Sequence, residues 1–219
     1  MDNPTVDPRA TTDGEGGAPL RTLAWAIVIG LLLGTLSRYS SRLTPSLGWL
    51  GNVGAPWLLV SFFVGRSCRS VRIAVVCGAV TLAAAAVAHY VGYRLARFGV
   101  DSEFLRYPLS LWVVVGAVAG GLLGVLGFIV RHGSSVAGMW STGALMACLA
   151  GEALLLFLVA PRHAYIVAGP VQLVAAGVLP FVVGTDRVKS YLVTAALMPF
   201  CAAGLWLMVV SIGRVYPGL

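Results

Sequence analysis

Long apolar segments separated by short polar links make up most of this chain. Seven of these segments approach or exceed the length of helix, ~20 residues, that crosses the hydrocarbon core of a bilayer. A chain in that core must satisfy its own backbone hydrogen bonds, which a helix does. We therefore expect an all-α, polytopic membrane helical bundle of about seven transmembrane helices, forming a single domain over residues 21–213. The pattern predicts helices over residues 21–37, 47–65, 73–93, 107–130, 136–160, 164–184 and 191–212.

The predicted helices carry two further patterns. The start of the second segment, GWLGNVGAPW over residues 48–57, is interrupted by glycine and proline and predicts a broken helix that lines a cavity. Glycines recur at every fourth position in two other segments, which predicts close approach of helix backbones. These are Gly30 and Gly34, and then Gly116, Gly120 and Gly124.

The ends of the chain have a different composition. Residues 1–20 are polar and partly acidic, which predicts a disordered tail. They lack the basic region and short apolar core of a signal peptide. Residues 214–219 form a short C-terminal tail.

Composition supports the membrane assignment and narrows the partners. The chain is 58% hydrophobic and 11% charged, with a mean hydropathy of +0.90, whereas soluble domains are about 25% charged. Its net charge is +7, but the arginines flank apolar segments, which favours lipid head groups over nucleic acid as their partners. We expect an integral plasma-membrane protein, and three arginines in one loop, Arg66, Arg69 and Arg72, predict that its N-terminus is cytoplasmic.

One acidic residue lies inside an apolar segment. Glu152 is the only Asp or Glu at such a position, and a charge there costs roughly +2.5 to +3.5 kcal/mol on insertion scales. Its carboxyl group is therefore either protonated or faces a wet cavity or a cation. A structural hydrogen bond to a neighbouring helix is the alternative. Intramembrane acids generally mark functional sites, so Glu152 is the first candidate catalytic residue.

The remaining polar residues gather in the half of the membrane opposite the N-terminal tail. Alternate threading of seven helices places Asn52, His89, Glu152 and Gln172 in that half. This asymmetry predicts a polar pocket, although a belt of interfacial Tyr, Trp and Arg residues would explain part of it. The further candidates are His89, Asp101 and Glu103 for proton transfer, and Asn52, Trp57, Tyr90, Tyr93, Trp112 and Gln172 for substrate binding.

Common catalytic motifs are absent from the sequence. It has no phosphate-binding loop, no HExxH sequence and no aspartate cluster for Mg²⁺, and the four cysteines lack metal-ligand spacing. We therefore expect no metal and no cofactor. A neutral buried acid could protonate an alkene or epoxide, and aromatic faces could stabilise the resulting carbocation.

In size, segment number and intramembrane acid, the chain resembles the small membrane-bound terpene cyclases of meroterpenoid and indole-sesquiterpenoid pathways. The resemblance implies cyclisation of a hydrophobic prenylated substrate, started by protonation from Glu152. Fungal members of that family use a second acid late in the chain. The last apolar segment here has none, which leaves Asp101 or Glu103 as the second acid.

Transport is the rival hypothesis. Small bundles of six or seven helices include vitamin-capturing subunits of similar size. In that case Glu152, Asn52 and Gln172 would bind a small solute or couple a proton. A membrane component with a purely structural role is the third interpretation.

Overall fold

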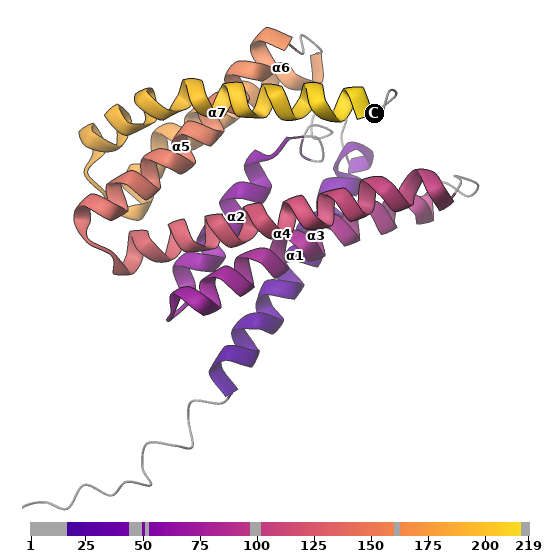
Figure 1. Ribbon diagram of the computed structural model, residues 1–219, viewed down its shortest axis with the longest axis horizontal. Helices are drawn as coiled ribbons and strands as arrows, with labels where there is room; N and C mark the ends of the chain where they lie inside the picture. Colours follow the sequence, from indigo (N-terminus) through magenta and orange to yellow (C-terminus); the bar gives the residue numbers. More distant parts are fainter. Residues whose placement is uncertain (1–16, 44–49, 51–52, 97–101, 160–162, 216–219) are drawn as a thin grey trace, which may run out of the picture.

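A computed structural model describes residues 17–43, 50, 53–96, 102–159 and 163–215 (Figure 1). Side chains are described for residues 20–40, 50, 53–92, 109–158, 167–208 and 210–211. The described chain is all-α, as predicted. Its helices are α1 (Gly17–Leu43), α2 (Ala55–Ser67), α3 (Val71–Ala96), α4 (Ser102–His132), α5 (Ser135–Val159), α6 (His163–Val183) and α7 (Arg187–Val215).

Five of these helices are long and apolar enough to cross a membrane, and α6 contributes a shorter apolar helix over Val167–Val183. Helix α2 has only 13 residues, which corresponds to about 20 Å at 1.5 Å per residue. A hydrocarbon core is about 30 Å thick, so α2 alone does not cross it. The protein is a multi-span helical membrane protein in which the described part of α2 is too short to span the core.

Several predicted boundaries are wrong. The second helix begins at Ala55 rather than at residue 47, because Gly54 and Pro56 form its N-terminus. Helix α4 begins at Ser102, so the polar link predicted before residue 107 is partly helical. Helix α1 begins at Gly17, inside the tail predicted to be disordered, whereas residues 1–16 lie outside the described part.

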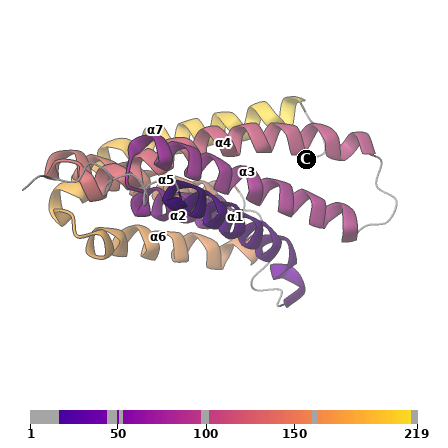
Figure 2. The same cartoon turned by 90° about the horizontal axis from the view of Figure 1, so that it is seen from below.

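The helices form two groups (Figures 1 and 2). In the first, α3 packs against α1 and α4, and α2 packs against α3 and α4. In the second, α5 packs against α6 and α7. The groups are joined by contacts between α4 and α5 and by a few between α2 and α5. The short helix α2 therefore lies beside the junction of the two groups.

Glycines permit the close packing of the first group. A Cβ atom on Gly30 or Gly34 would overlap backbone carbonyls of α3, and one on Gly120 would overlap the carbonyl oxygen of Gly78. The predicted close approach at these glycines is thereby confirmed. Where α2, α3 and α4 meet, the buried Ser61 hydroxyl donates to the carbonyl oxygen of Gly120 at 2.9 Å.

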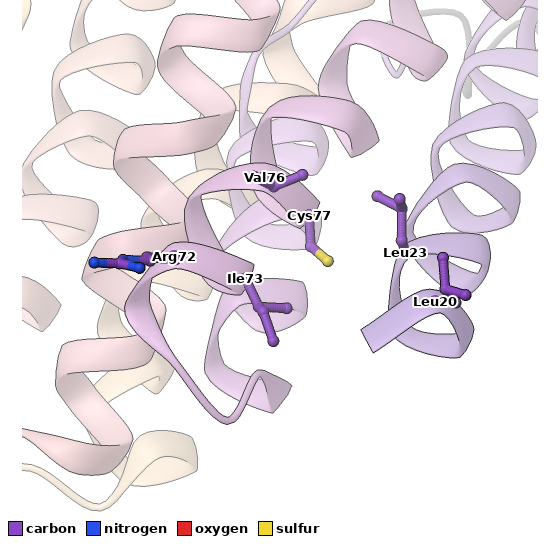
Figure 3. A pocket seen from close by; sticks show the side chains of 6 residues that line it. All are labelled: Leu20, Leu23, Arg72, Ile73, Val76 and Cys77. Carbon is purple, nitrogen blue, oxygen red and sulfur yellow. The ribbon is translucent and has the colours of Figure 1, made fainter. Parts of the chain in front are cut away.

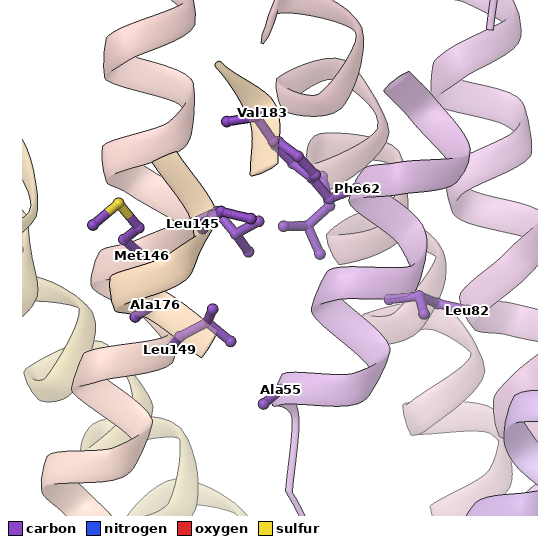
Figure 4. Packing of buried hydrophobic residues seen from close by; sticks show 10 residues of the cluster. Ala55, Phe62, Leu82, Leu145, Met146, Leu149, Ala176 and Val183 are labelled. Carbon is purple, nitrogen blue, oxygen red and sulfur yellow. The ribbon is translucent and has the colours of Figure 1, made fainter. Parts of the chain in front are cut away.

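A buried apolar cluster fills the space between the two groups (Figure 4). Phe62 of α2 points toward Leu145 of α5, and Leu149 and Ala176 lie nearer to Ala55. Many large apolar side chains outside this cluster are exposed, including Leu122 and Phe200. That exposure suits a protein surface surrounded by lipid.

Candidate functional site

Glu152 of α5 lies at the N-terminus of α2. The backbone N–H of Gly54, the residue that caps α2, donates to Oε1 of Glu152 at 2.5 Å. Gly54 has no side chain of its own with which to cap the helix, and Pro56 has no backbone N–H. The first turn of α2 therefore obtains its acceptor from another helix, and the positive end of the helix dipole faces the carboxyl group.

Only half of the Glu152 carboxyl group is used in this way. Oε2 is buried and has no hydrogen-bond partner. The backbone N–H of Ala55 also lies near the carboxyl group. A buried acceptor without a partner costs about 1–3 kcal/mol, so Oε2 is a position at which a donor would be stabilised.

Gln172 of α6 is another buried polar side chain with unpartnered atoms. It is 1% exposed, and neither its amide oxygen nor its amide nitrogen forms a hydrogen bond. It lies one helical turn from Ala168 and one from Ala176, and both of those alanines are buried. The Gln172 side chain therefore lies on the inward face of α6.

Two apolar clusters bracket these polar groups. Val53, Leu156 and Ala168 belong to one cluster. Ala55, Leu149 and Ala176 belong to the other. Each of three polar residues lies, in the sequence, between a member of one cluster and a member of the other. Gly54 lies between Val53 and Ala55. Glu152 lies between Leu149 and Leu156, and Gln172 lies between Ala168 and Ala176. We call Gly54, Glu152 and Gln172 the polar layer, because they occupy the level between the two clusters.

A row of aromatic rings extends from the same helix end. The Trp57 ring, one turn into α2, contacts His89 of α3 with centroids 5.9 Å apart. The His89 ring contacts Tyr90 at 5.4 Å. The indole of Trp112, from α4, lies within hydrogen-bonding reach of the Tyr90 hydroxyl. Nδ1 of His89 is buried and has no hydrogen-bond partner.

The structure thus brings together many of the predicted site residues. Glu152 and Gln172 belong to the polar layer, and Trp57, His89, Tyr90 and Trp112 form the aromatic row. Asn52 and Asp101 lie outside the described residues, as do the side chains of Tyr93 in α3 and Glu103 in α4. The functional group that sequence reasoning missed is the backbone N–H of Gly54. The glycine and proline around Ala55 are the signal for a helix start that could have indicated it.

Two surface grooves lie at the other end of the bundle, where the N-terminal tail joins α1. One lies between α1 and α3 and is lined by Leu20, Leu23, Arg72, Ile73, Val76 and Cys77 (Figure 3). The second lies between the ends of α2 and α4. Neither groove includes a residue of the polar layer. Among the side chains that the structure describes, no group of three His, Cys, Asp or Glu residues could hold a metal ion.

Residues 14–213 match a protein family described as "Family of unknown function (DUF6518)". The match covers most of the chain, so the chain belongs to this family. No curated protein and no solved structure matches it.

Proposed function

We propose that this DUF6518 protein is a membrane carrier or capture subunit, which binds a small solute in the polar layer. The observation that carries the proposal is the hydrogen bond from the N-terminus of the short helix α2 to Glu152. Transporters commonly build their sites from discontinuous helices whose ends face charged groups near mid-membrane. With Arg66 at the membrane surface, helix α2, about 20 Å long, would end within the hydrocarbon depth in this way.

The free polar atoms define the chemistry of the solute. Oε2 of Glu152 and the amide oxygen of Gln172 are acceptors, and the Gln172 amide nitrogen is a donor. A solute with at least two N–H donors, such as a small amine or amide, would satisfy both acceptors. A cationic amine would also balance the charge of the carboxylate.

Transport is tested with purified protein in proteoliposomes. We expect saturable uptake of a labelled small amine or amide by the wild type and loss of uptake in Glu152→Gln. Asp186→Asn is the matched control, because it makes the same change from acid to amide outside the polar layer. Equal uptake by wild type and Glu152→Gln across the panel of solutes would contradict the assignment.

The aromatic row favours a second candidate, a terpene cyclase initiated by protonation. Trp57, Tyr90 and Trp112 are the side chains that would stabilise a carbocation, and Glu152 would supply the proton. This activity requires a chemical change and no membrane gradient. Purified protein given a farnesylated or epoxidised prenyl aromatic without Mg²⁺ would then yield a product of unchanged mass. Recovery of starting material alone removes this candidate.

A further inference from the structure

The groove between the ends of α2 and α4 is lined by Phe63, Arg66, Ser67 and Arg131. Next to the groove, α4 carries glycine at position 127. A Cβ atom there would overlap the carbonyl oxygen of Phe62, so the two helices are in close backbone contact. One turn later, Nη1 of Arg131 donates to the carbonyl oxygen of Arg66 at 3.4 Å. Two guanidinium groups from distant parts of the sequence therefore meet at one groove.

The groove offers donors that the protein leaves unused. Nε of Arg66 is buried and has no hydrogen-bond partner. Arg131 is exposed, and one bond to a carbonyl leaves further guanidinium N–H groups free. The Ser67 hydroxyl donates to the carbonyl oxygen of Val64 at 2.7 Å, so the arginines supply the free donors. A buried guanidinium donor without an acceptor is uncommon and indicates a missing acceptor.

The groove also lacks a balancing carboxylate. In the described part of the chain, the one ion pair joins Lys189 to Asp186, at 3.3 Å. Among the described loop residues at this end of the bundle, the one carboxylate belongs to Asp186. It also accepts a hydrogen bond from the backbone N–H of Lys189. Arg69, in the loop after α2, and Arg72, in the first turn of α3, add positive charge nearby. An anion between Arg66 and Arg131 would relieve their mutual repulsion.

We propose that the groove of Arg66 and Arg131 binds a phosphate group, presented by an anionic lipid head group or by free phosphate. Guanidinium groups bind phosphate oxygens through paired N–H donors, which matches the donors that are free here. The site is distinct from the polar layer and holds whether or not the protein transports a solute. Lipid bound there would fix the end of α2 opposite Glu152.

The test uses native mass spectrometry of the full chain titrated with phosphatidylglycerol, with phosphatidylcholine as the uncharged comparison. We compare wild type with Arg66→Gln and Arg66→Lys, and use Arg69→Gln as the control for the loss of one loop charge. Arg66→Lys keeps the charge but loses the Nε donor. We expect affinity for phosphatidylglycerol to fall about tenfold or more in both Arg66 variants and to change little in Arg69→Gln.

A parallel arm measures protection from thermal unfolding by inorganic phosphate in lipid-free detergent. If inorganic phosphate protects the wild type but not the Arg66 variants, the site also binds free phosphate. If only phosphatidylglycerol protects the protein, the site binds a lipid head group. The proposal is overturned if Arg66→Gln and Arg69→Gln lose affinity equally, since the effect would then be general charge. Equal binding of phosphatidylglycerol and phosphatidylcholine by the wild type also overturns it.

Discussion

At the scale of single residues, the two carboxyl oxygens of Glu152 have different roles. Oε1 accepts the N–H of Gly54, whereas Oε2 is buried without a partner. A glutamine can accept the same N–H bond through its amide oxygen but carries no charge. A leucine can do neither. Substitutions at this one position therefore separate capping of α2 from any function of the charge.

We expect Glu152→Gln to fold and melt near the wild type, and Glu152→Leu to be destabilised by about 1–3 kcal/mol because the Gly54 N–H loses its acceptor. Thermal unfolding in detergent measures both. Equal melting temperatures for Glu152→Gln and Glu152→Leu would show that the hydrogen bond at Gly54 does not stabilise α2.

Sequence reasoning can single out candidate side chains but not backbone groups. The isolation of Glu152 in an apolar segment marks it as a candidate without any structure, and alternate threading predicts that His89 and Gln172 lie in the same half of the membrane. The partner of Glu152 could not be predicted in this way, because it is the N–H of Gly54. That partner exists only because α2 begins at Ala55 and α5 packs beside it.

At the scale of elements, the start of α7 depends on Asp186. Its side chain accepts the backbone N–H of Lys189 at 3.2 Å, which satisfies one donor of the first turn. This hydrogen bond, with the nearby Lys189 charge, lowers the pKa of Asp186. A carboxyl group whose pKa is lowered by folding stabilises the fold above its unfolded pKa. That stabilisation is lost as the pH falls through the folded pKa.

We therefore expect Asp186→Ala to melt below the wild type at neutral pH, with the difference shrinking once the pH falls below about 4, the ordinary pKa of an aspartate, and vanishing only below the lowered pKa of folded Asp186. Asp186→Asn keeps an uncharged cap and should show a weaker dependence on pH. Melting curves at several pH values provide the measurement. A difference between Asp186→Ala and wild type that grows on acidification would contradict the capping role.

The contact between α3 and α4 depends on glycine. Alanine at Gly120 would place a methyl group against the rigid backbone carbonyl of Gly78, so we expect a loss of about 1–3 kcal/mol in unfolding free energy. Gly177→Ala is the matched control, since a Cβ atom there meets nothing within 4 Å. Comparison of the two melting temperatures measures the effect. A Gly120→Ala protein as stable as Gly177→Ala would show that α3 and α4 pack less closely than described.

At the scale of the whole molecule, the lengths of the apolar segments predicted the helices, and the glycine and proline within residues 48–57 predicted an interruption of the second one, but length alone could not show where α2 begins. The apolar run through residues 47–65 looks long enough to span, and the helix nevertheless begins at Ala55. Apolar composition does not distinguish helix from other backbone. Glycine at 54 and proline at 56 decide where the helix starts.

The alternation of the helices also predicts topology. We predict that residues 68, 133 and 188 lie on the same side of the membrane as the N-terminal tail. Each of them follows an even number of membrane crossings if α2, together with the segment before it, crosses the membrane once. The Arg66, Arg69 and Arg72 loop predicts that this side is cytoplasmic. Reporter fusions at residues 10, 68, 133 and 188 should agree. Disagreement among them would show that α2 does not complete a crossing.

The central claim is that the polar layer binds a small solute with N–H donors. The most direct measurement is native mass spectrometry of purified wild type, Glu152→Gln, Gln172→Leu and Asp186→Asn, each incubated with a panel of small amines and amides. We predict a one-to-one complex with at least one compound for wild type and Asp186→Asn. Its affinity should be about tenfold or more weaker in Glu152→Gln and Gln172→Leu. Equal binding by all four proteins, or no binding by the wild type across the panel, would contradict the claim.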